Sequence, residues 1–226
     1  MHIFFDLDGT LTDSSPGILR CVNHALAELG HSVVTDARLR GMIGSPLTRI
    51  FSDVLVCDDE AVLDRAVAAY RVRFNAVGIF ENALYPGVAA ALDHLCRSGH
   101  TLQIVTAKPA AAARRVAEHF GIAPFFRAMH GPELSARDCN KADLVGAALQ
   151  VAGGNPRAAL MVGDRAADMI AAREHRVRAV AAAWGYGSRD ELERAAPEYV
   201  AETVPDLIRW VQTVTSDATV KDGTRA

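Results

Sequence analysis

The strongest constraint on the fold is a series of short apolar runs separated by segments with helical spacing. Runs of this kind are typical of strands buried on both faces. They occur at residues 3–7, 102–105, 128–130, 159–162 and 179–183. Helical spacing fills the intervals, with apolar side chains at Val88, Leu92 and Leu95 and in residues 142–151 and 168–175. Strand followed by helix, repeated, predicts an α/β domain with a doubly wound, Rossmann-like parallel sheet and helices on both faces.

One block interrupts this alternation. From about residue 16 to residue 77 the apolar spacing is helical throughout, and no convincing strand is present. The chain then returns through Tyr85-Pro86-Gly87, a turn sequence that precedes the next helix. We therefore expect an α/β core of residues 1–15 and 78–215, an inserted all-helical cap of residues 16–77, and a polar, aperiodic C-terminal tail of residues 216–226.

The composition argues against several classes of function. Half of the 226 residues are hydrophobic and 23% are charged, so the chain can bury a sizeable core and is not disordered as a whole. The net charge of −3, without blocks of one sign, gives no electrostatic footprint for nucleic acid or an anionic membrane surface. A small molecule is the expected partner, and the sequence leaves the oligomeric state open.

The cysteines and the first residues of the chain indicate the cellular compartment. Cys21, Cys57, Cys96 and Cys139 lie far apart with no CxxC pair, which indicates reduced thiols rather than disulfides or a zinc site. The initial apolar run is short and interrupted by Asp6, so it suits neither a signal peptide nor a membrane span. We therefore expect a cytoplasmic protein without membrane association.

Two carboxylates stand at the end of the first predicted strand. Asp6 and Asp8 are two residues apart, where they repel and desolvate each other unless a cation or a polar network compensates. A hard divalent cation would do so, and ligand sites of open α/β sheets lie outside the carboxyl ends of strands. Gly9 allows a tight turn, and Thr10 can form hydrogen bonds within it. A lone Asp-x-Asp is also typical of turns and helix caps, but a buried strand before it favours a functional site.

The segment Phe-Asp-Leu-Asp-Gly-Thr-Leu-Thr-Asp-Ser, residues 5–14, resembles the first motif of the haloacid dehalogenase superfamily, in its phosphatase branch. That resemblance predicts three further motifs in a fixed order. Thr106 closes an apolar strand, and Lys141 stands near a helix start. Asp164 and Asp168 form an acidic pair after another buried strand. All four motifs are similar to those of the superfamily, over residues 1 to about 212, and the block 16–77 resembles its helical cap.

The resemblance implies a catalytic role for each motif. Asp6 would attack phosphorus and form an aspartyl-phosphate, while Asp8 would protonate the leaving group and then activate water. Thr106 and Lys141 would stabilise the transferring phosphoryl group. Mg²⁺ would be the cofactor, with Asp6, Asp8, Asp164 and Asp168 as its metal-binding residues, Asp8 through its carbonyl.

Some positions depart from the superfamily pattern. Ala107 follows Thr106 where relatives often carry Asn, which removes one side-chain contact near the phosphate. Ala166 and Ala167 stand where polar residues are frequent. We therefore expect fewer side-chain hydrogen bonds around the metal ligands.

The cap is expected to close over the substrate and choose the leaving group. The loop of residues 41–47, with two glycines and a proline, suits this task, although an ordinary helix connection has the same composition. Arg49 and Arg73 are candidate anchors for a second anionic group, although single arginines are usually solvated. The expected substrate contacts are Thr10, Ala107 and Arg49.

Several functions remain open. The segment Ala-Trp-Gly-Tyr-Gly-Ser at 183–188 resembles the branch with phosphoglycolate phosphatases and some nucleotidases, so a phosphoglycolate phosphatase-like enzyme acting on a small phosphate ester comes first. A 5'-nucleotidase and a sugar-phosphate mutase similar to β-phosphoglucomutase use the same carboxylates. A dehalogenase is disfavoured because that chemistry does not need the second acid. Two further candidates come from other classes of protein. A regulatory module that is phosphorylated without turnover is disfavoured because such modules lack the helical insertion. A catalytically silent scaffold is disfavoured because the four motifs would then have no purpose.

Overall fold

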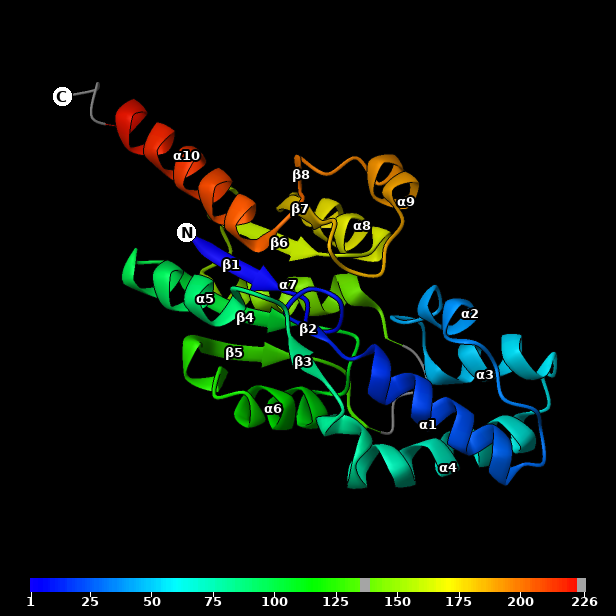
Figure 1. Cartoon of the computed structure of the whole chain (residues 1–226). Helices are drawn as coiled ribbons and strands as arrows, with labels where there is room; N and C mark the ends of the chain where they lie inside the picture. The colour runs from blue at the N-terminus through cyan, green and yellow to red at the C-terminus, as the bar shows by residue number, and fades with distance from the viewer. Residues whose placement is uncertain (135–138, 223–226) are drawn as a thin grey trace.

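A computed structural model describes residues 1–134 and 139–222. Within these residues, six strands form one parallel sheet (Figure 1). Their order across the sheet is β5 (Phe126–His130), β4 (Thr101–Val105), β1 (His2–Phe5), β6 (Ala159–Gly163), β7 (Arg178–Ala182) and β8 (Tyr199–Ala201). The predicted α/β class with a doubly wound parallel sheet is confirmed, and the five predicted apolar runs correspond to β1, β4, β5, β6 and β7.

Alternate residues of β1 build two separate cores, one on each face of the sheet. Ile3 and Phe5 pack against α5 (Val88–Arg97), α6 (Ala110–His119) and α10 (Val204–Asp222). Phe4 faces the opposite core. The helices on that side are α7 (Lys141–Val151), α8 (Ala166–Glu174) and α9 (Arg189–Arg194). Both faces of the sheet are therefore covered, as its continuous apolar strands require.

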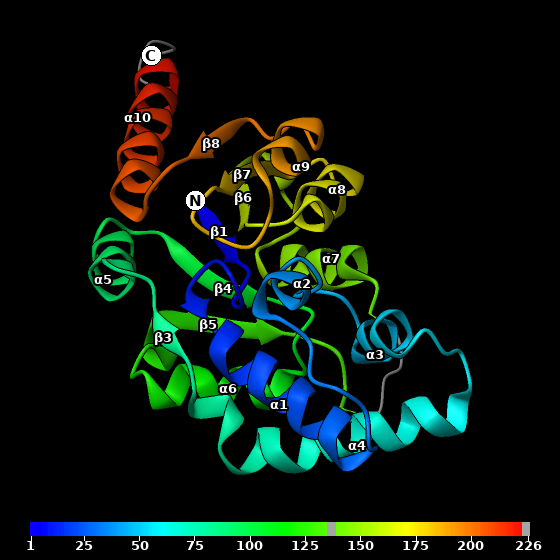
Figure 2. The same cartoon turned by 45° about the vertical axis from the view of Figure 1, so that its right-hand side comes forward.

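The helices that follow β1 have an apolar core of their own, beside the sheet (Figure 2). They are α1 (Ser15–Glu28), α2 (Asp36–Arg40), α3 (Leu47–Leu55) and α4 (Glu60–Ala76). Pro16 in the first turn of α1 and the Asp59 side chain, which accepts from the Ala61 and Val62 N–H groups, mark two helix starts. The lobe joins the sheet domain through a short ribbon of β2 (Thr12–Asp13) and β3 (Ala83–Leu84), next to the 3₁₀ turn Gly78–Phe80.

Short elements depart from the sequence predictions. The strand β8, the helix α2 and the ribbon β2–β3 were not expected; each is at most five residues long and carries too few apolar positions for a periodicity. Further 3₁₀ turns occur at Ala123–Phe125 and Pro156–Ala158. The helix α10 continues to Asp222, past the expected start of a tail at residue 216, and residues 223–226 lie outside the described part of the chain.

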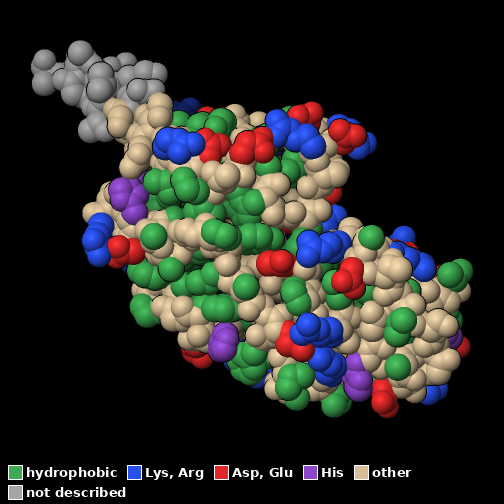
Figure 3. All heavy atoms as spheres, viewed as in Figure 1, with side chains coloured by type: hydrophobic (Ala, Val, Ile, Leu, Met, Phe, Trp, Pro, Cys, Tyr) green, Lys and Arg blue, Asp and Glu red, His purple; other side chains and the backbone are tan. Residues whose placement is uncertain are grey.

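The order of the strands decides which residues meet. β1 lies between β4 and β6, and Phe5 is paired with Ile104 on one side and Val162 on the other. The residues that follow these strands therefore share one edge of the sheet. On the face drawn in Figure 3, Lys and Arg side chains lie among Asp and Glu side chains. Among the helices described, none has the length and apolarity needed to cross a membrane.

Candidate active site

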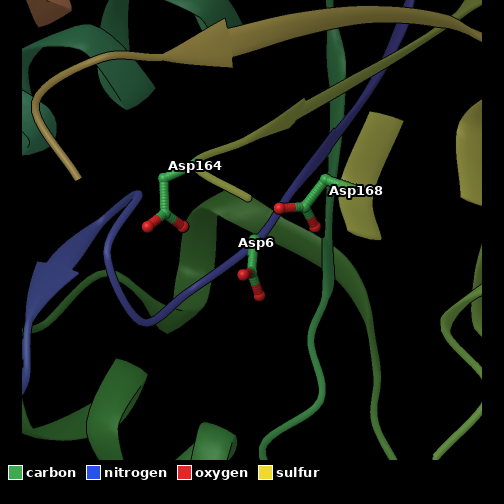
Figure 4. A group of neighbouring side chains, drawn as sticks. All are labelled: Asp6, Asp164 and Asp168. Carbon is green, nitrogen blue, oxygen red and sulfur yellow. The ribbon is translucent and has the colours of Figure 1, made fainter. Parts of the chain in front are cut away.

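Three buried carboxylates meet at the carboxyl edge of the sheet. Asp6 follows β1, Asp164 follows β6, and Asp168 lies in the first turn of α8. One oxygen from each carboxylate lies within 4.8 Å of those of the other two. Figure 4 shows the three side chains close together, with a carboxylate oxygen of Asp168 directed toward Asp6. Residues separated by more than 150 positions in the chain thus form one acidic cluster.

Burial makes this acidic cluster unfavourable by itself. Burial, and then the charges of Asp6 and Asp168, raise the pKa of Asp164 to about 8. Burial also raises the pKa of Asp168 to about 6, against the opposing charge of Lys141. These carboxyl groups therefore retain protons well above the pH at which exposed aspartates lose them.

Lys141, the first residue of α7, supplies one compensating charge. Its Nζ lies 3.0 Å from Asp6 Oδ2 and also contacts Asp168 Oδ1. Burial by itself would lower the pKa of Lys141, but the carboxylates of Asp168 and Asp6 raise it above its usual value. The side chain of Asn140 caps α7 by accepting the Ala142 N–H at 3.0 Å, which fixes where the helix begins. One ammonium group faces three carboxylates, so the cluster retains an excess of negative charge.

The acidic cluster has the donor set of a hard cation site. All of its ligand atoms are carboxylate oxygens, which hard divalent cations prefer. Asp6 Oδ1 is buried and has no hydrogen-bond partner among the described groups. An unpaired buried oxygen is costly unless something binds it. The residues present therefore fit a divalent cation.

Two loops hold Asp164 in a fixed orientation. The Thr10 hydroxyl donates to Asp164 Oδ1 at 3.2 Å, and the Tyr186 backbone N–H donates to Oδ2 at 2.7 Å. Gly9 has a φ of +90°, and a Cβ there would lie 2.2 Å from Asp164 Oδ2. A Cβ at Gly185 would lie 2.2 Å from Asp164 Cβ. The Gly-Tyr-Gly segment after β7 is thus required for close approach to the acidic cluster, and Thr10 directs its hydroxyl to a carboxylate.

Asp8 lies in a different environment from Asp6. Its Oδ2 is 2.6 Å from Nζ of Lys108, and its Oδ1 is buried with no hydrogen-bond partner among the described groups. Lys108 is not among the site residues predicted from the sequence. It stands two residues after Thr106, in a Thr-Ala-Lys-Pro sequence, and that short spacing from a predicted site residue was the available clue.

Thr106 follows β4 at the same edge of the sheet as Asp6. Its backbone N–H donates to the His130 carbonyl at 2.9 Å, and its hydroxyl accepts from the Lys108 N–H at 3.3 Å. Only 2% of Thr106 is exposed. The neighbouring Ala107 is half-buried and carries no polar side-chain atom, so only its backbone can donate to a ligand.

A family model described as haloacid dehalogenase-like hydrolase matches residues 3–182. The chain belongs to this family. The matched region includes all four motifs around the acidic cluster and the helical lobe of α1–α4.

Known relatives agree with this haloacid dehalogenase-like assignment. The chain is 39% identical over 198 residues to a 5'-nucleotidase from Pseudomonas aeruginosa, covering 88% of this chain and 89% of that protein. It is 33% identical over 214 residues to a phosphoglycolate phosphatase from Cereibacter sphaeroides, covering 92% and 97%. A crystal structure titled as a predicted phosphatase from Clostridium acetobutylicum superposes with a TM-score of 0.87 at 32% identity, covering 94% of this chain and 98% of that one.

Family and phosphatase relatives together identify a haloacid dehalogenase-like phosphoric monoester hydrolase. Another relative, 32% identical over 207 residues, is named tyrosine-protein kinase PtkA from Mycobacterium tuberculosis, with 91% of this chain and 70% of that protein covered. Experiments on the chain must therefore separate hydrolysis from other phosphoryl transfers.

Two arginines of this haloacid dehalogenase-like chain are engaged away from the acidic cluster. Arg49 forms an ion pair of 3.1 Å with Asp53 on the surface of α3, and 69% of its side chain is exposed. Arg73 binds Glu81 through hydrogen bonds of 2.6 and 3.0 Å and donates to the Cys21 sulfur at 3.2 Å. The structure brings neither guanidinium into contact with Asp6, Asp164 or Asp168, and their role as anchors for a second anionic group stays a prediction.

The loop of residues 41–47 contacts Arg165, a residue beside the acidic cluster that was not predicted from the sequence. The Arg165 guanidinium donates to the carbonyls of Ile43 and Gly41, the latter at 3.4 Å, and its Nε is 2.9 Å from Glu191 Oε1. The backbone N–H of Arg165 donates to Asp168 Oδ2 at 3.0 Å. Ala166 and Ala167 carry no polar side chain, but backbone N–H groups still bind the carboxylates of Asp164 and Asp168.

Proposed function

We propose that the chain hydrolyses a small phosphorylated metabolite in a magnesium-dependent reaction, with Asp6 as the nucleophile. One observation carries this proposal. The carboxylate oxygens of Asp6, Asp164 and Asp168 converge within 4.8 Å of one another at the end of β1, with Lys141 against two of them. A nucleophile beside groups that can hold a metal ion and a cation against the phosphoryl oxygens is what phosphoryl transfer requires.

Asp6, Asp164, Asp168 and the Asp8 carbonyl would hold Mg²⁺, which prefers a few carboxylates and retains several waters. The unpaired Asp6 Oδ1 and the raised pKa of Asp164 both support binding of a cation between these carboxylates. When bound, the ion supplies positive charge to the phosphoryl oxygens. Lys141 would add an ammonium group, and Thr106 would add its hydroxyl together with the backbone N–H of the following Ala107.

Asp6 and Asp8 have different roles in the proposed reaction. An oxygen of Asp6 attacks phosphorus, the bond from phosphorus to the leaving oxygen breaks, and Asp8 gives that oxygen a proton. Asp8 then takes a proton from a water molecule, which attacks the phosphorus of the aspartyl-phosphate and releases inorganic phosphate and free Asp6. Asp8 acts in both steps, so its carboxyl group must reach the leaving oxygen and then the water.

Residues 16–77 would form a cap that selects the leaving group, joined to the α/β core of residues 1–15 and 78–215. The substrate we propose first is phosphoglycolate or a similarly small ester. A second candidate, a nucleoside 5'-monophosphate, is favoured by the relative of 39% identity named 5'-nucleotidase. A mutase would instead pass the phosphoryl group to a second sugar hydroxyl.

The test measures phosphate release by the purified chain from p-nitrophenyl phosphate, with Mg²⁺ and with a chelator. We expect many turnovers per chain with Mg²⁺, and loss of activity in Asp6→Asn. Asp93→Asn is the matched control, because Asp93 is paired with Arg97 on the exposed side of α5. Release of one nitrophenolate per chain, with the phosphoryl group kept on the protein and no free phosphate, would indicate a phosphorylated module without turnover. Full activity of Asp6→Asn would exclude the proposed nucleophile.

A screen with phosphoglycolate, nucleoside monophosphates and hexose phosphates then separates the substrates. Phosphate release in proportion to consumed ester indicates hydrolysis. Transfer to an added hydroxyl acceptor or to a tyrosine peptide, without release of phosphate, would contradict the hydrolase assignment.

A further inference from the structure

Lys108 is a buried lysine directly beside the proposed acid and base. Only 6% of its side chain is exposed, and its Nζ lies 2.6 Å from Asp8 Oδ2. Lysine is almost never buried this far unless it is paired. The partner here is a carboxylate that stands 100 positions earlier in the chain.

The two oxygens of Asp8 have different surroundings. Oδ2 is occupied by Lys108, whereas Oδ1 is buried and has no hydrogen-bond partner among the described groups. A carboxyl group held through one oxygen loses rotational freedom, so the direction of the other oxygen is fixed. The free oxygen is the one that can exchange a proton with a bound molecule.

The backbone of Lys108 is itself held firmly. Its N–H donates to the Thr106 hydroxyl at 3.3 Å, and Pro109 follows, which restricts the chain. On the other side, a Cβ at Gly131 would lie 2.4 Å from the Lys108 carbonyl, so only glycine allows this contact. The Ala110 N–H donates to the Pro132 carbonyl at 3.1 Å. The ammonium group therefore extends from a rigid base.

The helical lobe covers the same ammonium group. The Lys108 Nζ lies 5.1 Å from the centre of the Phe74 ring in α4, which is a cation–π distance. Phe74 stacks on Tyr70 with ring centres 5.4 Å apart, and Tyr70 contacts Phe51 edge-on in the core of the lobe. A ring from the lobe thus shields the Lys108–Asp8 pair from water.

We propose that Lys108 is a positioning residue that holds Asp8 Oδ2 so that Oδ1 faces the oxygen of the departing group. This inference rests on the proposed function, because it assigns Lys108 to the proton transfer that Asp8 performs. Lys108 itself exchanges no proton and touches no reacting atom. A purely structural ion pair would instead affect stability alone, because removal of one partner leaves the other charge buried and uncompensated.

The experiment compares two substrates that differ in their need for an acid. Nitrophenolate leaves readily without a proton, whereas phenolate from phenyl phosphate needs one. The value of kcat/KM reports the steps up to aspartyl-phosphate formation. In Lys108→Met we expect it to fall about 100-fold with phenyl phosphate and less than about 10-fold with p-nitrophenyl phosphate, within the range that general acids contribute. KM should change little for either substrate.

Lys108→Arg should recover part of the loss with phenyl phosphate, because a guanidinium can also hold Oδ2. Arg97→Met is the matched control, since it removes one cation of an exposed pair on α5. Thermal unfolding of each variant checks the fold, and Lys108→Gln replaces Lys108→Met if the latter does not fold.

Equal losses with both substrates, or no loss, would overturn the positioning role while leaving the hydrolase intact. Absence of turnover in the unmodified protein would overturn the proposed function, and this inference with it.

Discussion

Asp6 and Asp8 show how neighbouring identical side chains acquire different tasks. Two residues apart on a strand, they would share one face, but β1 ends at Phe5 and the chain turns at once. The Leu11 and Thr12 N–H groups both donate to the Leu7 carbonyl in that turn. Asp6 therefore faces Lys141, while Asp8 faces Lys108. The turn, rather than the strand, separates the two carboxylates.

The raised pKa values of Asp164 and Asp168 predict a pH dependence of stability without metal. A carboxyl group whose pKa is higher in the folded than in the unfolded protein loses its stabilising contribution as pH rises. With an ordinary aspartate value of 3.8 in the unfolded protein and values of about 8 and about 6 in the folded one, we expect the unfolding temperature in a chelator to fall between about pH 4 and pH 8. Mg²⁺ should oppose this fall, because it favours the ionised carboxylates.

Asp164→Asn is the variant for this prediction. It should unfold with a weaker pH dependence in chelator and gain less stability from Mg²⁺ than the unmodified protein. Scanning calorimetry over this pH range provides the measurement. An unfolding temperature that rises with pH in chelator would contradict the assigned shifts.

Among the helices and strands, the sequence predicted those whose apolar residues recur with a regular spacing. The apolar runs of β1, β4 and β6 and the spacing of α1, α3 and α4 were sufficient to place them. The strand β8 was missed because only Ala201 of its three residues is fully buried. Lys108 and Arg165 were missed because their partners, Asp8 and Ile43, lie 100 and 122 positions away. Such pairings depend on the fold and leave no local pattern.

Arg165 fastens the loop of residues 41–47 to the sheet domain. Its guanidinium binds the carbonyls of Gly41 and Ile43, and its own backbone binds Asp168. In Arg165→Met we expect KM for the preferred ester of the substrate screen to rise about 10-fold, while kcat changes less, because hydrogen bonds from a charged group to the loop are lost. Steady-state kinetics provide the measurement.

Arg157→Met is the control for the loop prediction, because Arg157 is an exposed arginine in the turn before β6. If Arg165→Met instead lowered kcat alone, with KM unchanged, its role would lie with Asp168 rather than with the loop.

In the molecule as a whole, three apolar cores stabilise different parts of the structure. The two cores of the sheet hold β1 between β4 and β6, which brings Asp6, Thr106 and Asp164 to one edge. The third core builds the helical lobe, and Phe74 packs against both the lobe and the sheet domain. Four motifs were enough to predict the acidic cluster, because parallel strands align their carboxyl ends. The contacts between lobe and sheet required the structure.

In the proposed mechanism, Asp6 carries the phosphoryl group during turnover. The most direct test quenches the protein in acid during turnover of a ³²P-labelled ester and locates the label by peptide mass spectrometry. We predict an acid-stable, hydroxylamine-sensitive phosphoryl group on the peptide that contains Asp6, absent from Asp6→Asn. Label on a different residue, or turnover in which no labelled protein forms, would contradict the mechanism.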